Sequence, residues 1–172
     1  MTSGLFFLKI SMTPEIRILA ETKLLGKHMK MSYAKNTTSQ LWKSFMPTKN
    51  QISNAIGSNL YSMQIYPTLF RFENFNPNLE FTKWAAIEVT NFNVIPEGLE
   101  TYTIKGGLYA VFLHQGPAST FYVTFSKIFT DWLPKSDYEV DDREHFELLG
   151  EKYSNTNPNS EEEIWIPIKL KK

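Results

Sequence analysis

The chain has 172 residues, of which 42% are hydrophobic and 15% aromatic, so it is large enough to bury the core of one ordinary domain. Eighteen Lys and Arg balance eighteen Asp and Glu, and without an excess of positive charge no direct binding to nucleic acid is expected. The absence of cysteine excludes disulfides, thiolate metal sites and a cysteine nucleophile. The three histidines lie far apart in the sequence, so we expect no metal and no cofactor.

Residues 1–13 carry no strong pattern and are expected to form a loose leader of a single domain over residues 1–172. The short apolar run that begins at Leu5 is interrupted by Lys9, which is not typical of a signal peptide. No apolar segment approaches the roughly 20 residues of a membrane-spanning helix. We therefore expect a cytoplasmic protein with no membrane contact. The segment before Ile16 is too short for a helix-turn-helix, so no DNA-binding region of its own is expected.

Residue periodicity predicts the elements of the first half. Alternation of apolar and polar residues indicates strands, and apolar residues three or four positions apart indicate helices. Pro47 interrupts the helical pattern, because proline has no N–H for the backbone hydrogen bond. Asn, Pro and aromatic residues mix in an irregular loop over residues 70–79. The expected elements are strands at 16–25, 28–31, 60–66 and 84–89, a helix over 41–46 and a second helical segment over 52–56.

The second half has the clearer pattern. Gly106 and Gly107 stand inside a strand pattern and predict a bulge or a sharp bend. A broad apolar stripe with helical spacing follows, and Pro134 ends it. The charged run 141–144 is typical of an exposed turn. The expected elements are strands at 100–105, 108–114, 145–153 and 164–170 and a helix over 121–132.

The two halves follow the same order of strand, helix, strand and strand. The first copy covers about residues 15–92 and the second about residues 99–170. One copy buries too little to be stable alone, so both should form one domain. We predict an α+β fold in which two pseudo-symmetric repeats form one antiparallel sheet with the helices on one face.

Four segments of the chain resemble the GyrI-like family, the effector-binding domains of AraC-type bacterial regulators. They are residues 107–117 (GLYAVFLHQGP), 131–134 (DWLP), 146–147 (FE) and 163–168 (EIWIPI). The resemblance covers most of the chain after Ile16 and implies a ligand pocket between the two repeats, for small and often lipophilic, cationic molecules. Members of the family occur fused to DNA-binding regions or alone, and some stand-alone members are hydrolases of strained cyclopropyl compounds.

Strand alternation suggests which residues line this pocket. Glu163 and Trp165 share one face of the last strand, and its isoleucines, on the other face, suit packing under the helices. Glu147 and Leu149 share a face of the neighbouring strand, so we expect both carboxylates to line one aromatic-walled cavity. Leu149 and Trp165 stand where the family often has tyrosine. The expected ligand-binding residues are Glu147, Leu149, Glu163, Trp165, Tyr109, Trp84, Met63 and Ile65.

Two carboxylates in an apolar cavity favour a cationic, lipophilic ligand. Each loses hydration, and their mutual repulsion raises the pKa of at least one of them. A bound organic cation relieves both penalties, and contact with an aromatic face adds roughly 0.5–2 kcal/mol. The sequence therefore favours a small-molecule-binding protein, either a sensor or a sequestering domain.

Other interpretations stay open. Glu147 or Glu163 could act as the general base of a hydrolase that adds water to a strained electrophile. The chain could instead be a protein-interaction module of the gyrase-inhibitor type, with an unknown protein partner. Either carboxylate could also be a solvated surface charge, since Glu163 ends a run of three glutamates.

Overall fold

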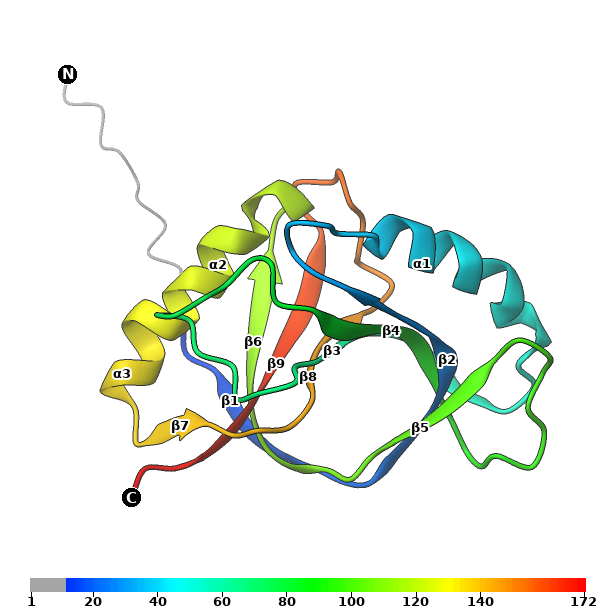
Figure 1. Ribbon diagram of the computed structural model, residues 1–172, viewed down its shortest axis with the longest axis horizontal. Helices are drawn as coiled ribbons and strands as arrows, with labels where there is room; N and C mark the ends of the chain where they lie inside the picture. The colour runs from blue at the N-terminus through cyan, green and yellow to red at the C-terminus, as the bar shows by residue number, and fades with distance from the viewer. Residues whose placement is uncertain (1–11) are drawn as a thin grey trace.

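The computed structural model describes residues 12–172, which form a strongly curled antiparallel sheet with helices on its outer face (Figure 1). The strand order is β1-β6-β9-β8-β3-β4-β2-β5, and β7 pairs with β9. The strands are β1 (Glu15–Leu19), β2 (Thr22–Met31), β3 (Ala55–Ile65), β4 (Phe81–Val89), β5 (Glu100–Ile104), β6 (Gly107–Gln115), β7 (Tyr138–Val140), β8 (His145–Leu149) and β9 (Glu161–Leu170). The helical segments are α1 (Thr38–Phe45), η1 (Met46–Gln51), η2 (Ala118–Thr120), α2 (Phe121–Lys127), η3 (Ile128–Trp132) and α3 (Leu133–Lys135).

The outer face of the sheet carries two separate hydrophobic clusters. Leu41 and Phe45 of α1 pack on β2 and β4, in a cluster that includes Leu25 and Ile87. Phe129, in the helical run that follows β6, packs with residues of β6 and β9 in the second cluster. The two helical layers thus cover the two ends of the same outer face, and the central strands β3 and β8 lie between them (Figure 1).

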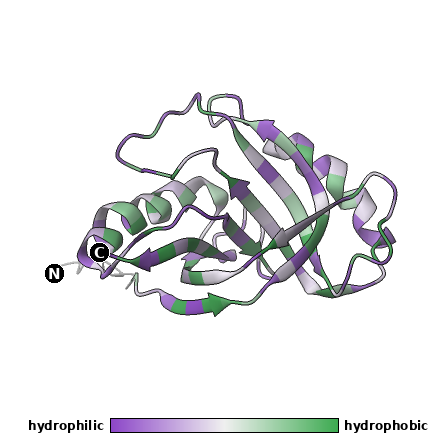
Figure 2. Ribbon diagram, turned by 60° about the horizontal axis from the view of Figure 1, so that its bottom comes forward, coloured by the Kyte–Doolittle hydropathy of each residue, from purple (hydrophilic) through white to green (hydrophobic). Residues whose placement is uncertain are grey.

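The inner face of the curled sheet is a third, aromatic core. Phe146 is 1% exposed and stacks on Trp165 with a ring separation of 5.1 Å. Tyr109 is fully buried and lies 5.4 Å from the same phenylalanine ring. Hydrophilic and hydrophobic residues alternate along several strands (Figure 2), as expected when the two faces of a strand have different surroundings. Aromatic side chains of the chain itself therefore pack against one another within the curve of the sheet.

The α+β prediction, with one antiparallel sheet and helices on one face, is confirmed, whereas the internal repeat stays a prediction. The expected helical segment at 52–56 is wrong, because β3 already begins at Ala55. The expected strand 16–25 is interrupted, since Ala20 and Glu21 separate β1 from β2. Of the expected leader, only Met12 and Thr13 lie within the described residues. Within these residues, no helix is long and apolar enough to cross a membrane.

The charged run 141–144 forms a bend between β7 and β8, as the sequence predicted, but only Asp142 in it is exposed. Arg143 donates to the backbone oxygens of Gly106 (3.3 Å) and Ile168 (3.3 Å), and its guanidinium lies 4.7 Å from the centre of the Tyr109 ring. Gly107 has a φ of 136°, and a Cβ added there would lie 2.7 Å from this guanidinium. Gly107 therefore leaves space for an arginine that ties the start of β6 to β9.

Candidate ligand-binding site

Polar side chains occupy the seam between the two outer clusters. Gln64 of β3 pairs in register with Lys83 of β4 and with His145 of β8, so the three share the outer face. Glu147 lies two residues after His145 in β8 and therefore on the same face. Its register partner in β9 is Ile164, and Glu162, two residues before Ile164, also lies on this face. We call Gln64, Lys83, His145, Glu147 and Glu162 the seam cluster. Polar residues between two apolar clusters, beneath the gap between helical layers, are a candidate binding site.

Four members of the seam cluster are buried and Glu147 is half-buried, and the cluster is incompletely paired. Gln64 donates from Nε2 to Oε1 of Glu147 at 3.2 Å. Lys83 is only 6% exposed, yet among the described residues its ammonium forms no ion pair within 4.0 Å. His145 is 4% exposed, and its Nδ1 has no hydrogen-bond partner within residues 12–172. Buried polar atoms without a partner are uncommon in proteins and mark this region for a ligand.

Burial and mutual charge shift the pKa values of this cluster. Burial raises the pKa of Glu147, and the nearby Lys83 charge and the Gln64 hydrogen bond oppose that rise. Burial and the charge of Glu147 raise the pKa of Glu162 to about 7. Burial lowers the pKa of Lys83, against the attraction of the two carboxylates. Burial, with the Arg143 charge, lowers the pKa of His145 to about 3, so this imidazole is neutral at physiological pH.

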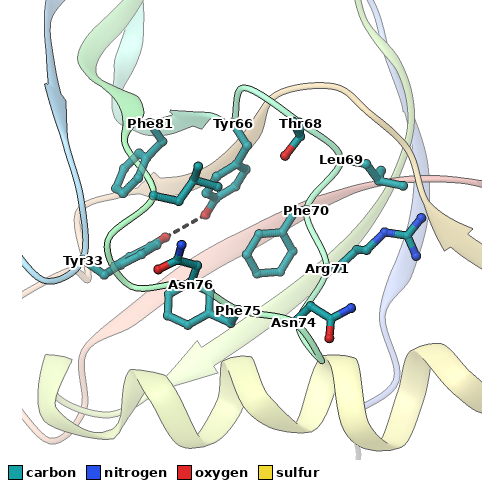
Figure 3. Close-up of a pocket in the computed structure, with 11 residues that line it drawn as sticks. Tyr33, Tyr66, Thr68, Leu69, Phe70, Arg71, Asn74, Phe75, Asn76 and Phe81 are labelled. Atoms are coloured by element: carbon teal, nitrogen blue, oxygen red, sulfur yellow. Dashed lines mark hydrogen bonds between the residues drawn. The ribbon is translucent and has the colours of Figure 1, made fainter.

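A pocket of about 260 Å³ lies beside the seam, within the long connection between β3 and β4, which we call the 66–80 loop (Figure 3). Two tyrosine hydroxyls in its wall, those of Tyr33 and Tyr66, are 2.7 Å apart. Burial raises the pKa of Tyr33 to about 12, and the negative charge of Glu147 adds to that rise. The pocket is lined by Tyr33, Tyr66, Thr68, Leu69, Phe70, Arg71, Asn74, Phe75, Asn76, Leu79 and Phe81.

Aromatic contacts join the pocket to the seam. The rings of Tyr66 and Phe70 lie 5.1 and 5.4 Å from the His145 ring, so residues of the pocket wall also contact the seam cluster. Phe70 also lies 5.2 Å from Phe129 of the second outer cluster, and Tyr66 lies 5.5 Å from Phe81 of the first. The 66–80 loop therefore bridges the two helical layers and covers one end of the seam.

Turn-forming residues fix the path of this loop. Asn76 accepts a hydrogen bond at its side-chain Oδ1 from the backbone N–H of Asn78 at 3.0 Å, the local bond that makes asparagine favourable in turns. The backbone N–H of Ala34 donates to the carbonyl of Pro77 at 2.9 Å and ties the loop to the segment that holds Tyr33. Two regions separated by about forty residues of sequence therefore share the pocket wall.

The structure separates the two carboxylates that the sequence analysis placed in one cavity. Glu147 pairs with Ile164, and Leu148 pairs with Glu163, so Glu147 faces the helices while Glu163 faces the inner core. The alternation within each strand was predicted correctly. The register between neighbouring strands was predicted wrongly. A shift of one residue in register is enough to exchange the two faces of a strand. Leu149 lies on the same side as Glu147, and the other expected ligand-binding residues, Trp165, Tyr109, Trp84, Met63 and Ile65, lie on the inner face.

On the inner face, Glu163 already has partners within the chain. Trp165 donates from its indole Nε1 to Oε1 of Glu163 at 3.3 Å, and Arg17 approaches the same carboxylate at 3.7 Å. The Arg17 guanidinium lies 5.5 Å from the centre of the Trp165 ring. Met63 and Tyr109, two of the expected lining residues, are fully buried in the aromatic core. The cation that Glu163 and Trp165 attract is therefore an arginine of the same chain.

Sequence reasoning missed most of the seam cluster. Lys83 had a readable signal, because it interrupts an apolar series on one face of β4 that includes Phe81, Ala85 and Ile87. Glu162 was hidden in a run of three glutamates, of which it alone is buried. No group of three or more His, Asp or Glu side chains in the described part of the chain could hold a metal ion.

A curled antiparallel sheet with helices on one face and an aromatic pocket beside a buried polar seam has the features of a domain that holds small molecules. Residues 12–169 match the model of the GyrI-like small molecule binding domain, and the chain belongs to this family.

Three relatives extend this assignment. Transcriptional regulator BrlR of Pseudomonas aeruginosa is 27% identical over 138 residues, which cover 77% of this chain but 47% of BrlR, so the chain spans about half of that relative. The structure of SAV2435 bound to tetraphenylphosphonium has a TM-score of 0.70 at 17% identity and covers 92% of this chain and 94% of its own. The EcmrR C-terminal domain has a TM-score of 0.68 at 12% identity, with 94% and 100% coverage. At such identities, the two structures show a shared fold.

Proposed function

We propose that this domain binds a small lipophilic molecule between the 66–80 loop and the seam cluster, and that it acts as a ligand sensor or as a sequestering domain. The observation that carries the proposal is the aromatic pocket whose wall contacts the seam cluster, through the rings of Tyr66 and Phe70 against His145, with the charge of the half-buried Glu147 acting on Tyr33. SAV2435, which shares the fold, is bound to a lipophilic cation. BrlR is a transcriptional regulator, which supports a sensing role for the matching half of its length.

The pocket supplies two kinds of binding energy. Aromatic ligand groups would bury apolar area against Phe70, Phe75 and Tyr66, at about 25 cal/mol per Å². Glu147 would orient a positive or hydrogen-bond-donating group of the ligand, because its charge is poorly solvated beneath the loop. A volume of about 260 Å³ lies near the lower end of the range for ligand pockets, so a bulky ligand would displace the 66–80 loop.

Calorimetric titration with tetraphenylphosphonium tests the proposal. The wild-type protein should show saturable binding with a Kd below about 1 mM, equivalent to about −4 kcal/mol. Glu147→Gln should weaken binding of this cation about tenfold or more, because it removes one of the two carboxylates that offset the positive charge of Lys83.

Glu163→Gln is the matched control, since it changes the same residue type on the neighbouring strand and the opposite face. Its Kd should stay within about twofold of wild type. A protein that shows no saturable binding into the millimolar range contradicts the proposed function. A loss of affinity in Glu163→Gln alone would move the site to the inner face.

A further inference from the structure

Lys83 is an unusual residue in this site. Its side chain points to the outer face of β4, between strands whose outward residues include Gln64 and Glu147. It is 6% exposed, and within the described residues it has neither a hydrogen bond nor an ion pair within 4.0 Å. A buried lysine is normally held by a close carboxylate. Here the ammonium is near two carboxylates and bonded to neither.

The net charge of the seam cluster depends on Lys83. Glu147 and Glu162 supply two carboxylates to the cluster, and Lys83 supplies its one cation, since His145 is neutral. Without Lys83, the seam would hold an acidic, poorly solvated surface beside an aromatic pocket, the environment that attracts a lipophilic cation. With Lys83 present, much of that attraction is already satisfied inside the protein.

We propose that Lys83 is the resident cation of the ligand site and determines its charge specificity. While Lys83 is present, its charge offsets that of the carboxylates, so the site binds cationic, uncharged and hydrogen-bond-accepting aromatic ligands with little preference among them. This inference rests on the proposed function, because it assigns the ligand class of the same site. Arg17, which lies over Trp165 beside Glu163, shows a comparable internal cation on the inner face.

The test uses two ions of nearly the same shape and opposite charge, tetraphenylphosphonium and tetraphenylborate, as chloride and sodium salts. The ratio of their two Kd values measures charge preference and cancels the apolar contribution that both ions share. The wild-type ratio should lie within about tenfold of one. Lys83→Met should shift it at least about tenfold toward the cation, and Glu147→Gln at least about tenfold toward the anion.

Lys23→Met is the control for a general change in protein charge. Lys23 lies on β2, six residues along the strand from Met29, the register partner of Lys83, and so about 20 Å away. It pairs at the surface with Glu21 at 3.5 Å. This variant should keep the wild-type ratio. Lys83→Gln, which keeps a polar head group, serves the same comparison if Lys83→Met does not fold.

The outcomes separate the inference from the proposed function. A ratio that changes less than about threefold in both Lys83 variants, while both ions still bind, overturns the role of Lys83 and leaves the binding function intact. An equal shift in Lys23→Met also overturns it. If neither ion binds saturably to any of the proteins, the proposed function fails and this inference fails with it.

Discussion

Glu147 and Glu163 occupy neighbouring strands, and the surroundings of these two carboxylates show how the two faces of the sheet differ. Glu163 lies at the rim of the inner core, where Trp165 donates to it, Arg17 approaches it, and its side chain remains 30% exposed. Glu147 lies in the seam under the helices, where burial raises its pKa and Gln64 is its hydrogen-bond donor. The first carboxylate has its cation within the fold, and the second lies beside a pocket.

This difference separates a face that stabilises the fold from the face on which we propose ligand binding. The inner face contains stacked and tilted aromatic rings that contact one another and leave their polar atoms paired, as in the Tyr109 hydroxyl bond to the Glu144 carbonyl. Within residues 12–172, the seam contains a His145 nitrogen without a hydrogen-bond partner and a lysine without a carboxylate within 4.0 Å. Buried polar groups whose hydrogen bonds are all formed make a core rigid. Polar groups next to a cavity that lack a partner favour a ligand that supplies the missing hydrogen bonds.

The largest expected effect is on the inner core. Phe146→Ala should lower the free energy of unfolding by about 3–5 kcal/mol, because it removes a ring packed against Tyr61, Tyr109 and Trp165. Chemical denaturation followed by tryptophan fluorescence measures this change. Phe75→Ala makes the same substitution at a residue of the pocket that is 44% exposed, and it should cost about 1 kcal/mol or less. Equal losses in the two variants would show that the inner face is not a packed core.

The sequence predicts well which residues of one strand share a face. It cannot predict which faces of two neighbouring strands lie on the same side of the sheet. Alternation correctly placed Ile164 under the helices and Glu163 away from them. Glu147 was assigned to the wrong side because the register of β8 against β9 depends on long-range pairing, and the polar turn between those strands does not fix it from sequence. The family resemblance predicted a ligand pocket, but the pocket wall joins Tyr33 to the 66–80 loop through tertiary contacts that local patterns do not encode.

The two neighbouring residues Glu161 and Glu162 provide a sharper comparison of the faces. The pKa of Glu162 is raised to about 7 in the fold, so between its ordinary value and pH 7 the folded state binds a proton that the unfolded state has lost. Its contribution to stability is therefore fully present below about pH 4.5 and is lost as the pH rises through 7. Glu162→Gln mimics the protonated form. Relative to wild type, it should gain on the order of 1–3 kcal/mol between pH 5 and pH 8.

Urea denaturation at a series of pH values measures that gain as a difference between two proteins. The opposite contribution of His145, whose lowered pKa makes the fold more stable as the pH rises from about 3 to 6.5, is common to both proteins and cancels. Glu161→Gln is the matched control, because Glu161 faces the other side and pairs with Lys152 at 3.6 Å near the surface. It should follow the wild-type pH profile. If the difference in unfolding free energy between Glu162→Gln and wild type did not change with pH, the Glu162 carboxylate would be exposed to solvent in the folded protein.

The smallest effect should come from the pair on the inner rim. Glu163→Gln should change the free energy of unfolding by about 1 kcal/mol or less, because the Arg17 side chain is 39% exposed, the contact is 3.7 Å, and water screens both charges. Glutamine also keeps an oxygen that can accept from the Trp165 indole. Denaturation in low salt and in 1 M salt checks the result, since salt should abolish whatever difference remains. A loss of several kcal/mol that persists in high salt would mean that Glu163 is buried as deeply as Glu147, and the contrast between the faces would disappear.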